Sequence, residues 1–545
     1  IAVSANDKSA SLSVTKGEFA GKVISPEGNC TLIKKGTIGD VLTLTGTGSE
    51  VYFTRVDGGT LRLSGGSYTS HITVGEDGVL EDTTADGVLG AKSTLTLNAG
   101  HASIVKDAIV QIDGDGTLDV GDTLTTTRGN FSGVISGGAL RVVREDAIDD
   151  TLTLSGANTY INATTLLRGN LILTGSLQSA SISLDDDSYF EDRNGGLADT
   201  AQLTNNGGVV LLGAAETVGN FYNNGGTLDG AGKVLTITSA AQLGAGSVIN
   251  ANLNATGATG LQVLGNTTLN GRSLGSLVSV ADGVTLTTGT GNGHFAETTA
   301  LTLGAGSRLS LGGSELLATV ADTATSRIDL GDRTLALGGN STIRGTIAGT
   351  AASRLTVLGN LTVDSAQLTY GVLDGSGTIT AASFTNKAGG TVKGTLHFTG
   401  AFTDNGILAP GNSPGTIVIG GNYTEAGTLQ PELGGTAAGS YDQVRIGGSS
   451  TIGAGATLAV QTYNNVQPAR GDVYQVIANA SGNALRSSGT FAHVTFDADG
   501  AAGSGAAVEN AAVLFDVNTG RVLATGLNAS GSTYSQLAPV AGQQS

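Results

Sequence analysis

The sequence is poor in the residues that usually build and lock a compact globular core. Its 545 residues include one cysteine, six prolines and no methionine or tryptophan, and aromatic residues make up 4% of the total. With a single thiol, at Cys30, no disulfide can form within the chain, so its stability must come from packing. A collagen helix is excluded, because no three-residue glycine period runs through the chain.

Positive charge and long apolar runs are also scarce. The chain has 27 Lys and Arg residues against 45 Asp and Glu residues, a formal net charge of -18. Nucleic acid is therefore a disfavoured partner, because its recognition needs clustered cationic side chains. No apolar run reaches the ~18 residues of a membrane helix, so we expect no membrane insertion of this portion. Because the sequence begins at Ile1 and opens without a signal peptide, we expect a processed or excised part of a longer protein.

What the chain does contain is glycine and short β-prone runs. There are 87 glycines, and hydrophobic residues make up 39% of the sequence. The mean hydropathy is +0.12, which disfavours a disordered chain. Leu, Val, Ile and Thr recur in short runs between glycines, a composition typical of turn-rich β-structure.

Segments with apolar residues at alternate positions recur along the chain, each flanked by small or turn-forming residues. Examples are Gly59–Gly65 (GTLRLSG), Asp150–Gly156 (DTLTLSG), Gly169–Gly175 (GNLILTG) and Gly394–Gly400 (GTLHFTG). Alternation at period two places one set of side chains on one face of a strand. A strand this short cannot bury its apolar face alone, so it must stack on neighbouring copies.

A second type of repeat indicates the spacing of these copies. The tetrapeptide NNGG occurs at Asn205–Gly208 and again at Asn223–Gly226, 18 residues later. Asn386 and Asn405, each followed by a glycine-containing turn, are 19 residues apart. These intervals suit one coil of a parallel β-helix, in which glycine and asparagine form the corners. The alternative is an antiparallel sandwich, which would usually carry more buried aromatic residues.

Two stretches resemble the passenger domains of type V autotransporters of Gram-negative bacteria. Residues 151–175, TLTLSGANTYINATTLLRGNLILTG, look like the passenger-associated transport repeat. Residues 406–477, which open with GILAPGNSPGTIVIGGNYT, resemble the pertactin-like C-terminal stretch. The resemblance implies an all-β, right-handed parallel β-helix that is elongated and has protruding loops. It also implies export through the outer membrane by the protein's own C-terminal β-barrel, which we expect to be missing from this portion.

The same observations divide the chain into three parts. Residues 1–40 look less regular and are expected to form an N-terminal cap or irregular first coils. Residues 41–405 are expected to form the β-helix. Residues 406–545 are richer in Tyr and Phe, and are expected to form a capped C-terminal module that the resemblance identifies as an autochaperone, which folds first.

Residues Gly411–Gly415, GNSPG, formally match the G-x-S-x-G motif of hydrolases that use a serine nucleophile. In such a site the residue after the serine donates its backbone N–H to the oxyanion, but here that residue is Pro414, which has no N–H. We therefore predict that Gly411, Ser413, Pro414 and Gly415 form a structural turn. No histidine stands in a metal-ligand or catalytic motif. The sequence accordingly predicts no enzymatic activity, no resident metal and no cofactor.

Arg470, Gly471 and Asp472 form an RGD tripeptide, a known integrin-binding signal. Gly-Asp before Tyr-x-Val also belongs to the C-terminal pattern of the resembled family, where it makes a turn. Both interpretations, a receptor-binding site and a turn, stay open from the sequence.

Two acidic stretches are candidate binding sites. The first is a candidate for a basic host partner or an ion, and consists of Asp185, Asp186, Asp187, Glu191 and Asp192. The second is a candidate for calcium, which prefers oxygen ligands, and consists of Asp113, Asp115, Asp119 and Asp122. Neither matches an EF-hand loop, so a solvated loop is the alternative for both.

These features predict a protein that acts by binding. We expect a virulence factor displayed on the bacterial cell surface or secreted, which binds host extracellular or plasma proteins. Adhesion is one such role, and capture of a complement regulator for immune evasion is another. The alternative is self-association of passengers, which would mediate aggregation or biofilm formation. A third possibility is an enzyme whose site the sequence does not reveal.

Overall fold

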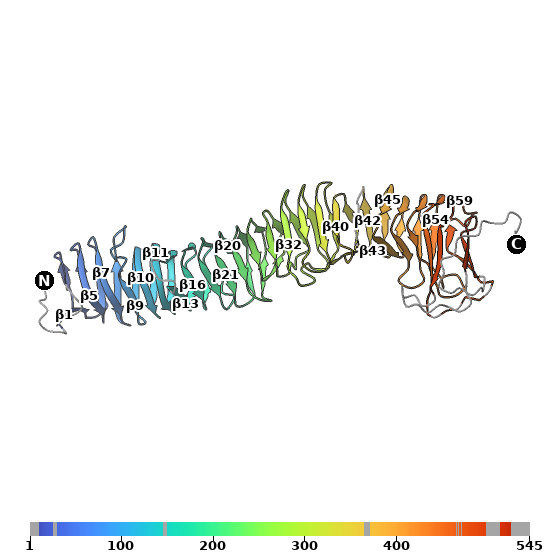
Figure 1. The fold of residues 1–545 in the computed structure, drawn as a ribbon. Helices are drawn as coiled ribbons and strands as arrows, with labels where there is room; N and C mark the ends of the chain where they lie inside the picture. Colours follow the sequence, from blue (N-terminus) through green and yellow to red (C-terminus); the bar gives the residue numbers. More distant parts are fainter. Residues whose placement is uncertain are drawn as a thin grey trace. The chain divides into compact units, whose positions relative to one another are not determined.

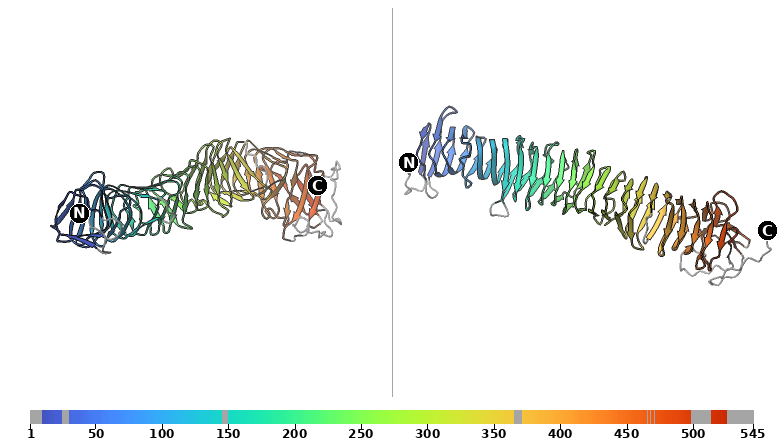
Figure 2. Two further views of the ribbon diagram at one scale, coloured as in Figure 1. Left: turned by 60° about the vertical axis from the view of Figure 1, so that its left-hand side comes forward. Right: turned by 90° about the horizontal axis from the view of Figure 1, so that it is seen from above.

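The computed structural model shows an all-β chain built from stacked coils. It describes residues 10–24, 30–144, 150–364, 371–464, 466, 468–469, 471–497 and 513–524. These residues contain strands and turns and no helix. Consequently, no helix that could cross a membrane occurs among them. The chain divides into two compact units, residues 1–275 and 276–545, in each of which successive coils run side by side (Figures 1 and 2).

The strands of the first unit pair in parallel from coil to coil. One ladder of the N-terminal coils is β1 (Ala10–Val14), β3 (Cys30–Lys34), β5 (Ser49–Val56), β7 (Tyr68–Val74) and β9 (Thr94–Leu97). The other is β2 (Gly17–Phe19), β4 (Val41–Leu44), β6 (Gly59–Leu63) and β8 (Gly78–Asp82). Both ladders continue into the long strands β10 (His101–Gly114), β11 (Thr117–Phe131) and β12 (Val134–Val143).

Three faces follow these long strands. The first comprises β13 (Thr151–Leu154), β16 (Asn170–Leu173), β19 (Tyr189–Asp192), β21 (Val209–Leu212), β24 (Thr227–Asp229), β27 (Ser247–Ile249) and β30 (Thr267–Leu269). The second comprises β15 (Ala163–Leu167), β18 (Ser181–Leu184), β20 (Gln202–Asn205), β23 (Asn220–Asn223), β26 (Ala241–Leu243) and β29 (Leu261–Val263). The third has the shorter ladders of β14 (Ala157–Asn158) with β17 (Ser176–Leu177), and of β22 (Glu216–Val218), β25 (Val234–Ile237) and β28 (Asn252–Ala255).

The core of this unit is a column of apolar side chains that point inward at the same level of each coil. Leu152, Leu171, Phe190, Val210 and Leu228 pair in register and are all 0% exposed. Their strand neighbours point outward, as the alternation of the sequence predicts. Each coil therefore buries its apolar face against the next, and the prediction of a parallel β-helix is confirmed.

Asparagine side chains inside the coils explain the 18-residue repeat. Asn205 and Asn223 pair in register and are both 0% exposed. Their Nδ2 atoms donate to the carbonyls of Gly208 (3.0 Å) and Gly226 (2.7 Å), which holds the following turn closed. Asn386 bonds Gly390 in the same way. Its partner in register is Asp404, however, and not Asn405, because the interval at this coil is 18 residues rather than the expected 19.

The strands of the second unit follow the same parallel pattern. One face comprises β31 (Leu277–Val280), β33 (Ala300–Leu303), β36 (Thr319–Ala321), β39 (Ser341–Ile343), β42 (Asn360–Val363), β44 (Thr378–Thr380), β47 (His397–Phe398), β50 (Thr416–Ile419), β54 (Gln443–Ile446) and β58 (Ile477–Asn479). Another comprises β35 (Glu315–Leu317), β38 (Thr334–Leu337), β41 (Arg354–Val357), β43 (Gly371–Gly375), β46 (Gly390–Gly394), β49 (Ile407–Pro410), β52 (Thr428–Leu429) and β56 (Thr457–Thr462), with β53 (Glu432–Leu433) and β60 (His493–Asp497) also paired to β56.

Two shorter ladders complete these coils. The first is β32 (Thr285–Thr288), β34 (Arg308–Ser310), β37 (Arg327–Gly331) and β40 (Thr346–Gly349). The second is β45 (Ser383–Asn386), β48 (Ala401–Asp404), β51 (Tyr423–Glu425), β55 (Ser450–Ile452) and β59 (Ser487–Gly489).

The C-terminal part of this unit departs from parallel stacking. Here β57 (Val473–Gln475), β62 (Arg521–Ala524) and β61 (Val513–Asp516) form an antiparallel sheet. Aromatic rings also fill part of the core of this unit. Phe384 and Phe402 pair in register with their ring centroids 5.8 Å apart, and Tyr423 continues the stack at 6.3 Å. Aromatic stacking adds to the area that these large side chains bury.

Candidate functional site

The sequence that matches the nucleophile motif forms a turn between β49 and β50. The backbone N–H of Gly411 donates to the carbonyl of Gly394 (2.7 Å), and that of Gly415 donates to the buried Asp442 carboxylate (2.7 Å). Ser413 is exposed in this turn, and the chain continues into a strand rather than a helix. The structure therefore places Ser413 and Pro414 at a corner of a coil.

Gly471 and Asp472 of the RGD tripeptide directly precede β57. Arg470 falls outside the described residues, whereas Gly471 and Asp472 are described. The Asp472 carboxylate accepts hydrogen bonds from the backbone N–H of Ala469 (2.8 Å) and the hydroxyl of Tyr474 (3.3 Å). Both donors lie within three residues of Asp472, so this carboxylate already has local partners.

The first acidic stretch separates into an exposed turn and a partly buried strand. Asp185, Asp186 and Asp187 are exposed in the turn after β18. Glu191 forms an ion pair with Arg193 (2.7 Å), which lowers the pKa of the Glu191 carboxyl. Asp192 is 1% exposed, and its Oδ1 accepts hydrogen bonds from the backbone N–H groups of residues 194 to 196.

The second acidic stretch is dispersed over separate partners. Asp113 accepts from Asn130 N (2.8 Å) and Asp115 accepts from Ala99 N (2.7 Å). Asp119 contacts Ser136 and His101, and Asp122 accepts from Thr123. No group of three or more His, Cys, Asp or Glu side chains that could hold a metal ion occurs in the part of the chain that the structure describes.

The first unit carries an aromatic cluster on its outer surface that sequence analysis does not single out. Tyr52 and Phe53 are consecutive on β5, yet both side chains point outward and are 43% and 45% exposed. They share a side because the register between β5 and β7 shifts between Glu50 and Phe53. Their ring centroids lie 4.6 Å apart in an edge-to-face arrangement. The ring of His71 on β7 lies 5.1 Å from Tyr52 and 5.8 Å from Phe53. We call Tyr52, Phe53 and His71 the aromatic cluster.

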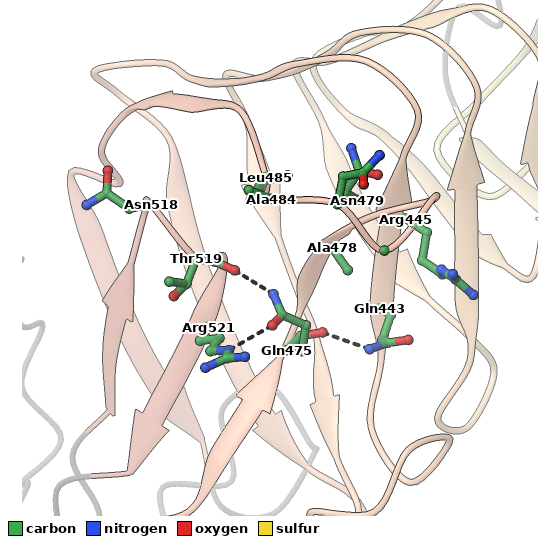
Figure 3. A pocket seen from close by; sticks show the side chains of 12 residues that line it. Gln443, Arg445, Gln475, Ala478, Asn479, Ala484, Leu485, Asn518, Thr519 and Arg521 are labelled. Carbon is green, nitrogen blue, oxygen red and sulfur yellow. Dashed lines mark hydrogen bonds between the residues drawn. The ribbon is translucent and has the colours of Figure 1, made fainter. Parts of the chain in front are cut away.

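The second unit carries a polar pocket of about 460 Å³ between its parallel coils and the antiparallel sheet. Side chains of β54, β57, β58 and β62 and the loop after β58 surround it (Figure 3). Arg445 and Arg521 lie on opposite sides of this pocket, with Gln475 between them (Figure 3). We call it the arginine–amide pocket.

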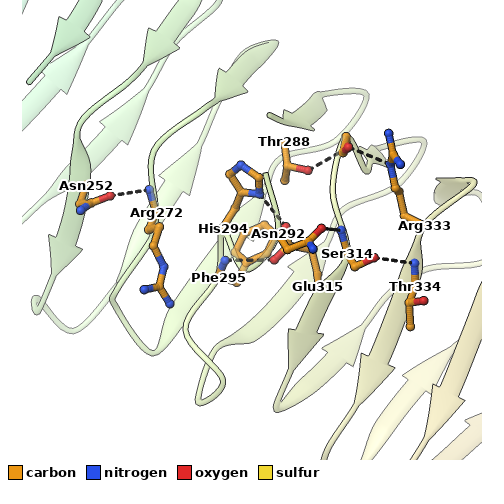
Figure 4. A network of polar contacts seen from close by, with 11 residues as sticks. Asn252, Arg272, Thr288, Asn292, His294, Phe295, Ser314, Glu315, Arg333 and Thr334 are labelled. Atoms are coloured by element: carbon orange, nitrogen blue, oxygen red, sulfur yellow. Dashed lines mark hydrogen bonds and ion pairs between the residues drawn. The ribbon is translucent and has the colours of Figure 1, made fainter. Parts of the chain in front are cut away.

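A buried histidine–glutamate contact joins two coils of the same unit. His294 Nδ1 lies 2.7 Å from Glu315 Oε1, and these side chains are 4% and 0% exposed (Figure 4). The other carboxylate oxygen of Glu315 accepts the backbone N–H of Phe295 (3.2 Å). On the next coil, Thr334 N donates to Ser314 Oγ (3.1 Å). These contacts satisfy backbone groups where a turn interrupts the ladder, and indicate a structural role.

Buried carboxyl groups also pair across neighbouring coils. Asp82 and Asp107 form one such pair. Burial raises the pKa of Asp107, and the nearby charge of Asp82 raises it further. Asp192 and Glu216 form a second pair, and Asp404 and Glu425 a third. In each pair one oxygen, on Asp107, Asp192 or Asp404, is buried without another hydrogen-bond partner. A proton held by one carboxyl of a pair can donate to that oxygen.

Comparison with known proteins gives a likeness at the level of structure. No protein-family model and no curated protein matches the chain. The chain is similar to the Haemophilus influenzae Hap adhesin. The similarity has 13% identity and a TM-score of 0.21, and covers 95% of this chain and 63% of that one. The chain thus spans less than two thirds of the length of the Hap adhesin chain, and a likeness this distant has no bearing on function.

Neither the aromatic cluster nor the arginine–amide pocket was found from the sequence, and each omission has a physical reason. The Tyr52–Phe53 pair breaks the alternation of β5, and that break is the one signal in the sequence that could have indicated a bulge. The arginine–amide pocket joins residues from three separate segments of the chain, 443–445, 475–485 and 518–521, so no local pattern indicates it.

Proposed function

We propose that the protein is an adhesin of the autotransporter-passenger type, displayed on the bacterial surface or secreted, which binds host proteins. The sequence stretches 151–175 and 406–477 and the parallel β-helix support this proposal. The proposal assigns no catalysis to the chain.

The aromatic cluster is the observation that carries the proposal. Aromatic side chains are enriched at the energetically dominant positions of protein interfaces. Tyr52 and Phe53 expose large apolar surfaces to water although neighbouring outward positions of the same ladder, such as Thr31 and Thr94, carry small polar residues. A partner that covers the two rings removes this apolar area from water, which favours binding.

A second candidate function is self-association, and a different observation favours it. Outward asparagine side chains form bonded pairs across neighbouring coils, such as Asn224 to Asn206 (2.9 Å) and Asn270 to Asn250 (2.9 Å). An amide retains unused donors and acceptors after one such bond. The regular spacing of these pairs would let a second copy of the chain bond to them.

The test is binding of the full chain to three immobilised surfaces: extracellular-matrix proteins, plasma complement regulators and the protein itself. We expect Tyr52→Ser with Phe53→Ser to weaken binding to a matrix or plasma protein by about 10-fold or more, because interface aromatic residues commonly contribute over ~1.4 kcal/mol. The matched control is Ile38→Ser, which removes an apolar side chain that is 77% exposed in the same unit.

The outcomes separate the two functions. Binding of host proteins that survives the double substitution, or that Ile38→Ser weakens equally, contradicts the assigned role of the cluster. Binding only to the immobilised protein itself favours self-association instead.

A further inference from the structure

The arginine–amide pocket differs in charge from the rest of the chain. Acidic residues outnumber basic ones by 45 to 27 in the sequence. The residues that line the pocket nevertheless include Arg445 and Arg521 and no Asp or Glu. The pocket is thus a locally cationic site on an acidic protein, which favours an anionic ligand.

Both guanidinium groups have N–H donors to spare. Arg521 Nε donates to Gln475 Oε1 (2.8 Å) and Arg445 Nη2 donates to the carbonyl of Ala480 (3.0 Å). Neither forms an ion pair with any described acidic residue. A guanidinium has five N–H donors, so each arginine can still bind an anion at its remaining nitrogens.

The floor of the pocket is held in place by Gln475. Its Nε2 donates to the carbonyl of Thr519 (2.5 Å), and Gln443 Nε2 donates to the backbone carbonyl of Gln475 (2.9 Å) (Figure 3). The same Nε2 also donates to the carbonyl of Ile477 (2.6 Å). Arg521 is therefore anchored through Gln475 to two backbone segments. A cation that is fixed before binding loses less conformational entropy when the ligand arrives.

One acidic residue stands opposite Arg521 in the antiparallel sheet, but its carboxylate is occupied elsewhere. Asp516 is the register partner of Arg521 in the antiparallel sheet. Its Oδ1 accepts the backbone N–H of Asn518 (2.9 Å) and its Oδ2 accepts the hydroxyl of Thr519 (2.7 Å), so both oxygens bind their own turn. Asp516 stabilises the rim of the pocket without forming an ion pair with Arg521.

The remaining lining residues indicate which kind of anion fits. Asn479, Asn483 and Asn518 carry carboxamides, which offer acceptors as well as donors. Inorganic phosphate and sulfate have little use for acceptors, whereas sugar hydroxyls need both. Ala484 and Leu485 add an apolar wall, which suits the C–H face of a pyranose ring. The volume of about 460 Å³ lies in the roughly 300–1,000 Å³ range of small-molecule sites.

We infer that the arginine–amide pocket binds a carboxylated saccharide, with the carboxylate at a guanidinium, the hydroxyls at the carboxamides and the ring against Leu485. Sialic acids and uronic acids share this chemistry. This site lies in the second unit and the aromatic cluster lies in the first, so the inference goes beyond the proposed function and does not depend on it.

The experiment is isothermal titration of the full chain with three saccharide probes. These are N-acetylneuraminyl-lactose, a hyaluronan tetrasaccharide and neutral lactose. We expect one of the two acidic saccharides to bind and lactose not to bind. We expect Arg445→Gln or Arg521→Gln to weaken that binding by about 10- to 100-fold, as loss of a charge-assisted hydrogen bond predicts. Arg486→Gln is the matched control, because Arg486 is exposed in the same unit and does not line the pocket.

A ligand-side control covers the case in which a variant does not fold. The methyl ester of the bound saccharide keeps its shape and loses its charge, and we expect it to bind the unaltered protein at least 10-fold more weakly. Absence of binding by both acidic saccharides overturns the inference, as does equal binding of the ester or an equal loss in the Arg486→Gln variant. None of these results affects the binding of host proteins through Tyr52 and Phe53, so the two proposals fail separately.

Discussion

Carboxyl groups inside the β-helix are the titratable residues whose protonation differs most from that of the unfolded chain. Burial raises the pKa of Asp442 to about 8, although its oxygens accept the N–H groups of Gly415 and Glu432. Burial, reinforced by the neighbouring carboxyl of each pair, likewise raises the pKa of Glu216 and Glu425. The folded state therefore holds protons at a pH where an unfolded carboxyl, with a pKa of about 4, has lost them.

The first residue-scale prediction is that stability falls as pH rises from about 4 to about 8. Each carboxyl that keeps its proton only in the folded state lowers the free energy of unfolding by about 1.4 kcal/mol per pH unit across this window. The pKa of Glu191 is lowered in the folded state, so this carboxyl changes the free energy of unfolding only at pH values below this window. Urea-denaturation midpoints at about pH 5, 6.5 and 8 measure the effect. A midpoint that rises with pH would contradict it.

A single substitution isolates the contribution of the Asp404–Glu425 pair to the pH dependence of stability. Glu425→Gln replaces an ionisable carboxyl with a neutral amide of the same shape. The N–H of this amide can donate to Asp404 in place of the proton of the Glu425 carboxyl. The decline in stability should then be shallower than in the unaltered protein. Glu76→Gln, at an exposed position, is the control and should leave the pH dependence unchanged.

At the scale of strands and turns, successive coils approach each other so closely that some corners admit only glycine. Gly394, with φ of +87°, sits against the carbonyl of Gly375 on the preceding coil. A Cβ at this position would lie inside the contact distance of that oxygen. Gly439 has almost the same φ, +86°, but no atom within 4 Å of an added Cβ.

Alanine substitutions at these two glycines distinguish the energetic cost of backbone strain from the cost of steric contact between coils. Gly439→Ala should lower the free energy of unfolding by about 1 kcal/mol, because alanine tolerates positive φ poorly. Gly394→Ala should cost more, on the order of 2–4 kcal/mol, because the coils must also move apart. Chemical denaturation of both variants measures the difference. Equal losses would show that coil spacing adapts freely at this corner.

At the scale of the whole molecule, the excess of acidic residues is the dominant electrostatic feature. With a formal net charge of -18, like-charge repulsion opposes the folded state. Ion pairs between coils, such as Arg62 with Glu81 (2.8 Å) and Arg128 with Asp150 (3.0 Å), offset part of this repulsion locally. The surface pairs contribute little each, so the net repulsion decides the response to salt.

Salt should therefore stabilise the protein. Raising NaCl from about 10 mM to about 500 mM shortens the Debye length from ~30 Å to below ~8 Å and screens the repulsion. We expect the midpoint of thermal unfolding to rise by about 1 to 3 °C. Differential scanning calorimetry at both salt concentrations tests this, and a lower midpoint at high salt would show that the ion pairs outweigh the repulsion.

The sequence by itself determined the parallel β-helix and which side chains of a strand point inward. Alternation at period two assigns inward and outward faces within a strand, and the repeat of Asn205 at Asn223 indicates the coil length, because both asparagines close a turn from inside. Only the tertiary structure decided which outward side chains meet. The interval between paired residues of neighbouring coils varies, from 16 residues between Thr391 and Ile407 to 37 between Ser450 and Ser487, because loops of different length leave the ladders. The carboxyl pairs, the aromatic cluster and the arginine–amide pocket all depend on that interval.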